Sequence, residues 1–195
     1  MCSSDLDTGA LYRAVAYYLD KNGIAPKDSE ELSAALSSLD VRLEKEGVFI
    51  EGEDVSAAIR SPHVDGIVAA YATLITVRNA LLELQREQAK YGDLIVDGRD
   101  TGTVVFPEAD MKFYITASPK TRAERRYREL LKKGMPVLYQ DVLTQICERD
   151  RADSERSISP LREPEDSIRI DTSPKGEEEV VNELAFMIQR GMLRE

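Results

Sequence analysis

The sequence has few of the residues that build metal centres and disulfide frameworks. Its 195 residues include no tryptophan, one histidine and two cysteines, Cys2 and Cys147. Two cysteines are too few for a disulfide framework, so a reducing cytoplasm is the expected location. One histidine and two scattered cysteines also give no reason to expect a zinc site.

Positive charge and long hydrophobic runs are scarce as well. The chain has 26 lysines and arginines against 36 aspartates and glutamates, a formal net charge of -10. A protein that binds a nucleic acid polymer normally presents a basic surface, so we do not expect that partner. No run of about 18 apolar residues occurs, so we expect no membrane-spanning helix. The length and the globular composition suit one α/β unit with a small inserted subdomain, which we expect to be a monomer.

The first half of the chain has mixed helical and strand patterns. Apolar spacing predicts a helix over 10–20 and a second over 29–38, with Ser29 as its cap. Alternation over 39–56 is typical of a small antiparallel hairpin. A longer three- and four-residue spacing predicts a single helix over 62–90.

Short apolar runs and helical segments alternate in the second half. The expected strands and helices, in chain order, are 94–96, 112–115, 119–133, 137–150, 167–170 and 176–190. Strands that alternate with helices form a parallel sheet with helical crossovers. The predicted fold class is therefore α/β.

The segment DGRDTGTVVFP, residues 97–107, directly follows the first of these strands. Ligands of open α/β sheets bind at the carboxyl ends of strands. Glycines let a ligand approach the backbone there, and Arg99 can hold a phosphate with two parallel hydrogen bonds. The carboxylates of Asp97 and Asp100 can bind a metal or the amino group of a base. The alternative is a polar turn in which these side chains pair with one another.

Residues 148–156, ERDRADSER, place Arg149, Asp153 and Arg156 on one face if a helix continues through them. Two cations beside a carboxylate can hold a phosphate and sugar hydroxyls together. The alternative is a ladder of surface salt bridges, which is common in such charge runs.

Two more segments could bind an anion. RAERRYR carries Arg122 and Arg126 on an expected helix, and DTGALYR carries Thr8 and Arg13 where a loop enters a helix. The amides at a helix start favour a negatively charged ligand. The arginine-rich segment could equally be a solvated helix face.

These segments together resemble the bacterial cytidylate kinases, which phosphorylate CMP and dCMP with ATP. The matching stretches are LDTGALYR, EGEDVSAAIRSPHV, LIVDGRDTGTVVFPEADMKFYITAS, RAERR and ERDRADSERSISPL, in the family's order. The resemblance implies a P-loop nucleoside-monophosphate-kinase fold: a parallel sheet with helices on both faces and a small α+β insertion. It implies a core of residues 1–20 and 93–195, an NMP-binding insertion over 21–92 and a lid near 149–162.

The resemblance also implies a role for each matching residue. The residues implied in substrate binding are Thr8, Arg13, Ser56, Arg60, Arg99, Asp100, Arg149, Asp153 and Arg156. Of these, the phosphate of CMP is assigned to Arg13, Arg99 and Arg156. The cytosine is assigned to Ser56, Arg60 and Asp100, and the sugar hydroxyls to Arg149 and Asp153. The residues expected near ATP and the lid are Arg122 and Arg126. The expected catalytic residues are Asp97, Arg99 and Arg149, with Asp97 also a candidate contact to Mg²⁺, directly or through water.

One part of the family pattern is not found. The P-loop, G-x-x-x-x-G-K-[ST], holds the phosphates of ATP, and this sequence contains no Gly-Lys dipeptide. We therefore expect an N-terminally truncated member of the family that lacks the first strand, the P-loop and the first helix. We expect residues 1–5 to have no counterpart in the family. We also expect the chain as written to be inactive. For the N-terminus, the alternative is a divergent start. For the function, one alternative is a non-catalytic CMP-binding remnant or an unstable fragment. Another is a different nucleoside monophosphate kinase, but the EGEDVS-x-x-IR motif argues against that one.

Overall fold

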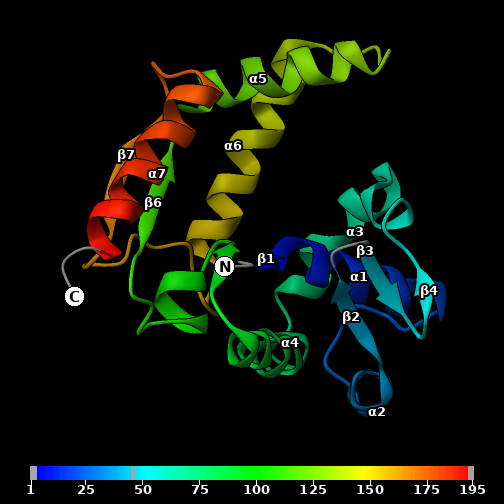
Figure 1. The fold of residues 1–195 in the computed structure, drawn as a ribbon. Coiled ribbons are helices and arrows are strands. Elements are labelled where there is room, and N and C mark those ends of the chain that lie inside the picture. The colour runs from blue at the N-terminus through cyan, green and yellow to red at the C-terminus, as the bar shows by residue number, and fades with distance from the viewer. Residues whose placement is uncertain (1–3, 45–46, 193–195) are drawn as a thin grey trace. The chain divides into compact units, whose positions relative to one another are not determined.

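The computed structural model describes residues 4–44 and 47–192 (Figure 1). Cys2 lies outside the described residues. The chain divides into two compact units, residues 1–101 and 102–195. Each unit is described by itself.

Unit 1 begins with a parallel pair of strands. β1 (Ser4–Asp7) pairs with β5 (Leu94–Asp97). The helix α1 (Thr8–Lys21) starts directly after β1, because the carboxylate of Asp7 accepts a hydrogen bond from the amide of Ala10 at 2.9 Å. This side-chain acceptor satisfies one of the unpaired amides of the first turn.

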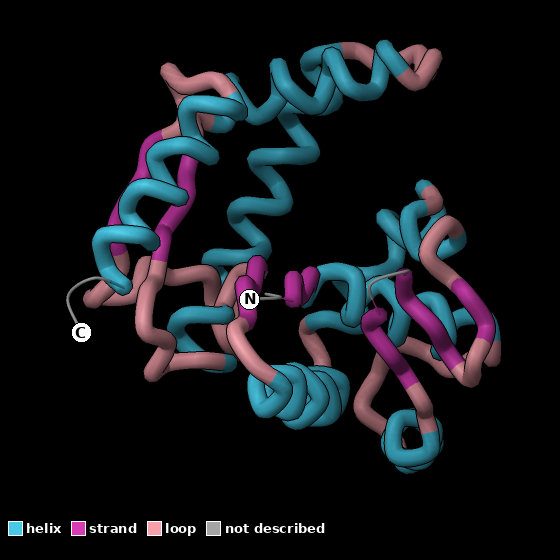
Figure 2. Tube along the Cα trace, viewed as in Figure 1, coloured by secondary structure: helices cyan, strands magenta, loops and turns pink. Residues whose placement is uncertain are grey.

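A small antiparallel sheet follows α1, as the alternating sequence predicts. The helix α2 (Glu30–Ser38) is capped by Ser29, whose hydroxyl accepts from the amide of Leu32. After it, β2 (Val41–Glu44), β3 (Gly47–Ile50) and β4 (Glu53–Asp54) form one sheet in the order β2-β3-β4 (Figure 2).

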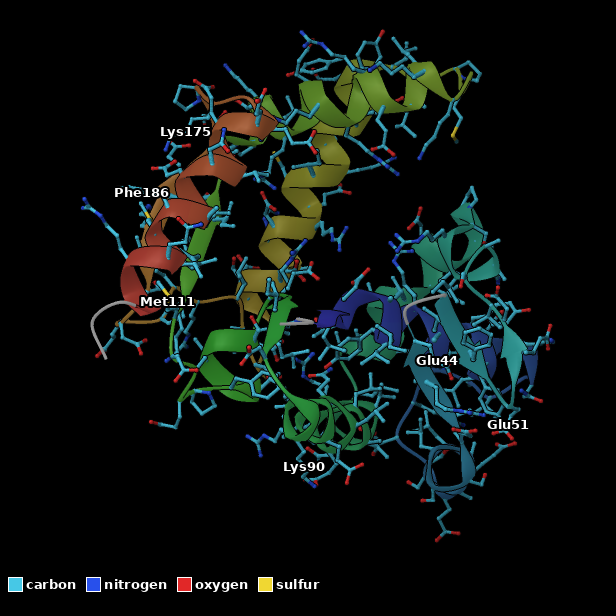
Figure 3. All side chains as sticks on the ribbon, viewed as in Figure 1. Glu44, Glu51, Lys90, Met111, Lys175 and Phe186 are labelled. Carbon is cyan, nitrogen blue, oxygen red and sulfur yellow. The ribbon has the colours of Figure 1, made fainter. Side chains whose placement is uncertain are left out.

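The β3–β4 connection is a tight hairpin turn at Glu51 and Gly52. Their φ angles are 50° and 81°, and positive values at both central residues match the twist of the flanking strands. The Glu51 side chain, labelled in Figure 3, accepts a hydrogen bond from the amide of Asp40 at 2.9 Å. This bond connects the turn to Asp40, the residue that precedes β2, and so stabilises the turn.

The single helix predicted over 62–90 is wrong: two helices occupy this stretch. α3 (Pro62–Ala72) and α4 (Ile75–Gln88) are bent by 99°. Leu74 is extended between them, and the guanidinium of Arg78 donates to the last carbonyl of α3 at 2.8 Å. The apolar spacing continues from α3 into α4 without interruption, so the sequence pattern does not reveal the break between the two helices. Among the described helices, none could cross a membrane alone; α3 and α4 reach the required length and hydropathy only as this bent pair.

The core of unit 1 is centred on α1. Leu11, Val15 and Leu19 recur every four residues on one face of this helix and are fully buried. Val64 of α3 and Val77 of α4 are fully buried as well. Two 3-10 turns complete the unit, Ala58–Arg60 and Ala89–Tyr91.

Unit 2 contains the second parallel pair and three helices, all of which the sequence predicts. β6 (Phe113–Thr116) pairs with β7 (Ile168–Asp171). α5 (Pro119–Lys132) and α6 (Tyr139–Glu155) pack together, and α7 (Glu177–Met192) follows β7. The unit is entered through a π-helical turn at residues 101–105.

The predicted parallel sheet is confirmed in the direction of its strands but not in its extent. In the described part of the chain, β1–β5 and β6–β7 form two separate two-stranded sheets. Ile95 of β5 and Ile115 of β6 are 56% and 53% exposed. Each pair therefore leaves apolar surface uncovered.

Candidate functional site

In unit 1, the carboxyl ends of β1 and β5 bring the segments DTGALYR and DGRD together. Asp7 lies opposite Asp97 in the parallel register. The hydroxyl of Thr8 donates to the Asp97 carbonyl at 2.8 Å, and a side chain at Gly98 would come within 2.3 Å of that hydroxyl. Only glycine fits this close approach. Both segments thus start from the same strand-end edge, as expected for a ligand site in an α/β protein.

The carboxylate of Asp97 at the end of β5 lies close to a second carboxylate, that of Asp7. Partial burial and the neighbouring carboxylate of Asp7 raise its pKa above the ordinary value, while the guanidiniums of Arg99 and Arg60 oppose the shift. Two carboxylates at adjacent strand ends repel one another, and a positive charge near Asp97 would relieve that repulsion.

Asp100 is buried and forms an ion pair with Arg78 of α4. The side chains of the two residues are 8% and 6% exposed. The guanidinium of Arg78 also donates to the carbonyl of Ala72 and lies 5.3 Å from the ring centroid of Tyr12. Sequence reasoning found Asp100 but missed Arg78, which lies in the segment mistaken for the middle of one long helix.

One N–H donor of the Arg78 guanidinium is unsatisfied. Its Nε atom is buried and has no hydrogen-bond partner among the described residues. A buried donor without a partner costs about 1–3 kcal/mol, so it calls for an explanation, and a functional role is one. Arg78 and Asp100 together offer one unused donor beside one carboxylate acceptor.

Two further arginines of unit 1 are bound to carboxylates. Arg13 of α1 lies 2.6 Å from Asp65 of α3. Arg60 lies 3.3 Å from the carboxylate of Asp7, which is also the cap of α1. Arg13, predicted at the phosphate, and Arg60, predicted at the base, therefore each have an internal counter-charge that the sequence did not reveal.

Ser56 lies at the edge of the small sheet of unit 1. Its hydroxyl accepts from the amide of Val48 at 2.9 Å, and its own amide donates to the carboxylate of Asp54 at the same distance. These bonds fix the Ser56 side chain in place. Its predicted contact with a ligand stays a prediction.

In unit 2, Arg122 and Arg126 are on α5, one turn apart. Arg122 makes two parallel hydrogen bonds to Asp150 of α6, at 2.8 and 2.5 Å. Arg126 pairs with Glu129, three residues further along α5, at 2.9 Å. Both ion pairs are half-exposed, which is compatible with the solvated helix face given as the alternative for this segment, and the predicted ATP contacts stay predictions.

The helix α6 brings Arg149, Asp153 and Arg156 together, as their spacing predicts. The Asp153 carboxylate lies 4.0 Å from Arg149 and 3.9 Å from Arg156. Arg156 is the cap residue at the end of α6, is 12% exposed and donates to the carbonyl of Ser159 at 2.6 Å. Arg149 is 64% exposed. The three side chains form one cluster in which a carboxylate separates two cations.

Comparison with known proteins accounts for this combination of segments. The cytidylate kinase family model matches residues 3–190. The chain belongs to the cytidylate kinase family. A cytidylate kinase from Clostridium tetani is 40% identical over 190 residues, which cover 97% of this chain and 84% of that protein. The cytidylate kinase of Carboxydothermus hydrogenoformans is 42% identical over 189 residues, covering 95% of this chain and 85% of that protein.

The cytidylate kinase match corrects one expectation about the start of the sequence. It begins at residue 3, so residues 3–5 do have a counterpart in the family, and Ser4 and Asp5 are part of β1. We expected no counterpart for this segment, which lacks the apolar residues of a buried strand, and Ser and Asp are poor strand formers. Residues 4–7 nevertheless form a strand, because they pair in parallel with β5.

Proposed function

We propose that the chain transfers the terminal phosphoryl group of ATP to CMP and dCMP, giving CDP and dCDP, in cytoplasmic pyrimidine nucleotide metabolism. The buried pair of Arg78 and Asp100 supports this proposal most directly. We further propose the functional division of core 1–20 and 93–195, insertion 21–92 and lid 149–162. The family resemblance supports that division.

The chemistry of Arg78 and Asp100 matches cytosine better than uracil. A carboxylate accepts hydrogen bonds only, and the cytosine amino group donates. The spare Nε–H of Arg78 donates, and the ring nitrogen and carbonyl of cytosine accept. Uracil presents a carbonyl where cytosine has its amino group, and the Asp100 carboxylate would repel it. The pair would therefore select CMP over UMP.

The remaining predicted residues supply the charge that phosphoryl transfer requires. Positioning and electrostatic stabilisation dominate this chemistry, and little covalent work is left to the protein. The proposed contacts to the CMP phosphate are Arg13, Arg99 and Arg156, with Thr8 at the same helix start. Ser56 and Arg60 would assist at the base, Arg149 and Asp153 at the sugar, and Arg122 and Arg126 at ATP.

The residues at the strand ends fit a hydrated Mg²⁺ ion. Asp97 offers the oxygen ligand that Mg²⁺ prefers, and the Asp7 carboxylate adds negative charge beside it. Among the described residues, no group of three or more acidic, histidine or cysteine side chains is placed to hold a metal ion, so we propose that Asp97 acts mainly through metal-bound water. When bound, Mg²⁺ neutralises charge on the transferring phosphoryl group.

The second candidate function is CMP binding without turnover. It is favoured by the sequence, which contains no G-x-x-x-x-G-K-[ST] motif. An assay that couples ADP formation to CMP addition discriminates between the two candidates. We expect this 195-residue polypeptide to turn over at least about 10³-fold more slowly than a relative that carries the motif, because loss of a single arginine finger costs a comparable factor in related enzymes. CMP-dependent ADP formation at any rate above background would eliminate the second candidate, whereas CMP binding without it would eliminate the first.

Asp100→Asn tests how the base is selected. The amide keeps the size of the side chain but adds N–H donors that suit the uracil carbonyl. We expect the ratio of CMP to UMP affinity, measured by calorimetry, to fall about 10- to 100-fold, since a hydrogen bond to a charged group contributes about 1.5–3 kcal/mol. Arg99→Ala is the matched control: it should weaken both nucleotides equally, because they share the phosphate. An unchanged ratio in Asp100→Asn would show that Asp100 does not select the base.

A further inference from the structure

Arg13, the residue proposed to bind the CMP phosphate, is already bound to a carboxylate of its own unit. Its Nη2 atom lies 2.6 Å from Oδ1 of Asp65, and its Nη1 atom donates to the carbonyl of Ile59 at 3.2 Å. The Arg13 side chain is 20% exposed, whereas that of Asp65 is 42% exposed. Asp65 is therefore the more exposed partner of this ion pair.

Asp65 keeps its place without acting as the cap of its helix. The cap of α3 is Ser61, whose hydroxyl accepts from the amide of Val64, and the Asp65 amide donates to the Ser61 carbonyl at 3.1 Å. An acidic residue in the first turn also interacts favourably with the helix dipole. The cap would survive replacement of Asp65, so the charge can be removed with little change to α3.

We propose that Asp65 is an internal competitor for the phosphate group of the nucleotide. This inference rests on the proposed function, in which Arg13 contacts that phosphate. A carboxylate and a phosphate both bind the guanidinium through parallel N–H···O bonds, so each excludes the other from the same donors. Asp65 also repels the phosphate charge at short range. It lowers the affinity for CMP and speeds nucleotide release.

A positioning role for Asp65 would have the opposite consequence. If the ion pair served only to orient Arg13 for the ligand, loss of Asp65 would disorder the guanidinium and weaken binding. The two roles therefore predict changes of opposite sign in CMP affinity. Only the competitor role depends on the charge of Asp65 rather than on its shape.

Asp65→Asn separates charge from shape, because the amide oxygen still accepts a hydrogen bond from Arg13. We expect the 195-residue chain carrying this substitution to bind CMP about two- to fivefold more tightly in low-salt calorimetry, the range that a partly exposed ion pair provides. Binding of cytidine, which has no phosphate, should not change. The gain for CMP should shrink at high salt.

Asp20→Asn is the matched control. It removes the same single charge and also breaks a polar contact between α1 and α3, because the Asp20 carboxylate lies 2.8 Å from Nε2 of His63. Asp20 is seven residues beyond Arg13 on the same helix, about 10 Å away at 1.5 Å per residue. We expect no change in CMP affinity for this variant.

The possible results distinguish the inference from the function on which it rests. Unchanged or weaker CMP binding by Asp65→Asn, together with weaker binding by Arg13→Ala, would overturn the competitor role alone. Equal tightening by Asp65→Asn and Asp20→Asn would overturn it as well, since net charge would then explain both. Unchanged CMP binding by Arg13→Ala, or no CMP binding by the unaltered chain, would refute the proposed phosphate contact and the inference with it.

Discussion

The two units differ in how deeply they bury their side chains. Among the described residues, all of the largest fully buried side chains lie in unit 1: Leu11, Val15, Leu19, Leu32, Ile59, Val64, Val77 and Gln85. The buried apolar residues of unit 2 are fewer and smaller: Val105, Ala117, Ala123, Val142 and Ile170. Phe186 of α7, labelled in Figure 3, is 54% exposed.

The same difference appears in the charged residues of the candidate site. In unit 1, Arg78 and Asp100 form a pair that is almost completely buried. In unit 2, Arg122 and Asp150 form a pair in which each side chain is more than one-third exposed. A buried pair is fixed by the packing around it, whereas a half-exposed pair is screened by water and exchanges partners at little cost. The pair proposed to read the base is thus held rigidly by packing in unit 1, whereas the Arg122–Asp150 pair of unit 2 is only partly buried.

Breaking the two ion pairs should give the largest contrast. Asp100→Ala leaves the Arg78 charge buried and unpaired, which we expect to lower the free energy of unfolding by about 3–5 kcal/mol. Asp150→Ala leaves Arg122 in contact with water and should cost about 0–1 kcal/mol. Urea unfolding followed by circular dichroism measures both. Equal costs would show that the two pairs do not differ in environment.

A smaller contrast is expected inside unit 2. Ile115 and Ile170 are register partners in the β6–β7 pair, but the first is 53% exposed and the second 2%. Ile170→Ala should lower the free energy of unfolding by about 2–4 kcal/mol through lost packing. Ile115→Ala should cost less than about 1 kcal/mol. If the two substitutions cost the same, Ile170 is not the core position of this unit.

The smallest expected effect concerns Asp97 in unit 1. Because folding raises its pKa, the ionised carboxylate opposes folding at pH values above its ordinary pKa of 3.8, and this cost disappears once the pH falls below that value. Asp97→Asn should therefore raise the melting temperature at pH 7 by about 1–2 °C, a value reduced for exposure to water. The gain should vanish near pH 3. A lower melting temperature at pH 7 would mean that Asp97 stabilises the loop instead.

The sequence alone determines most of the local structure and the family. The capping residues Ser29 and Ser118 mark where α2 and α5 begin, because a cap acts on amides two or three residues away. The helices and strands of unit 2 follow from apolar spacing for the same local reason. The segments DGRD and ERDRADSER indicate candidate site residues because the order and spacing of a motif can be read directly from the sequence.

Only the tertiary structure decides which charges meet. Arg78 reaches Asp100 across 22 residues, Asp65 meets Arg13 across two packed helices, and the chain turns by 99° between α3 and α4 while its apolar pattern continues. Each outcome depends on which surfaces are buried together, and burial fixes the partner of a charged side chain by making an unpaired charge costly. Sequence spacing indicates the candidate residues of this site, and packing determines their partners.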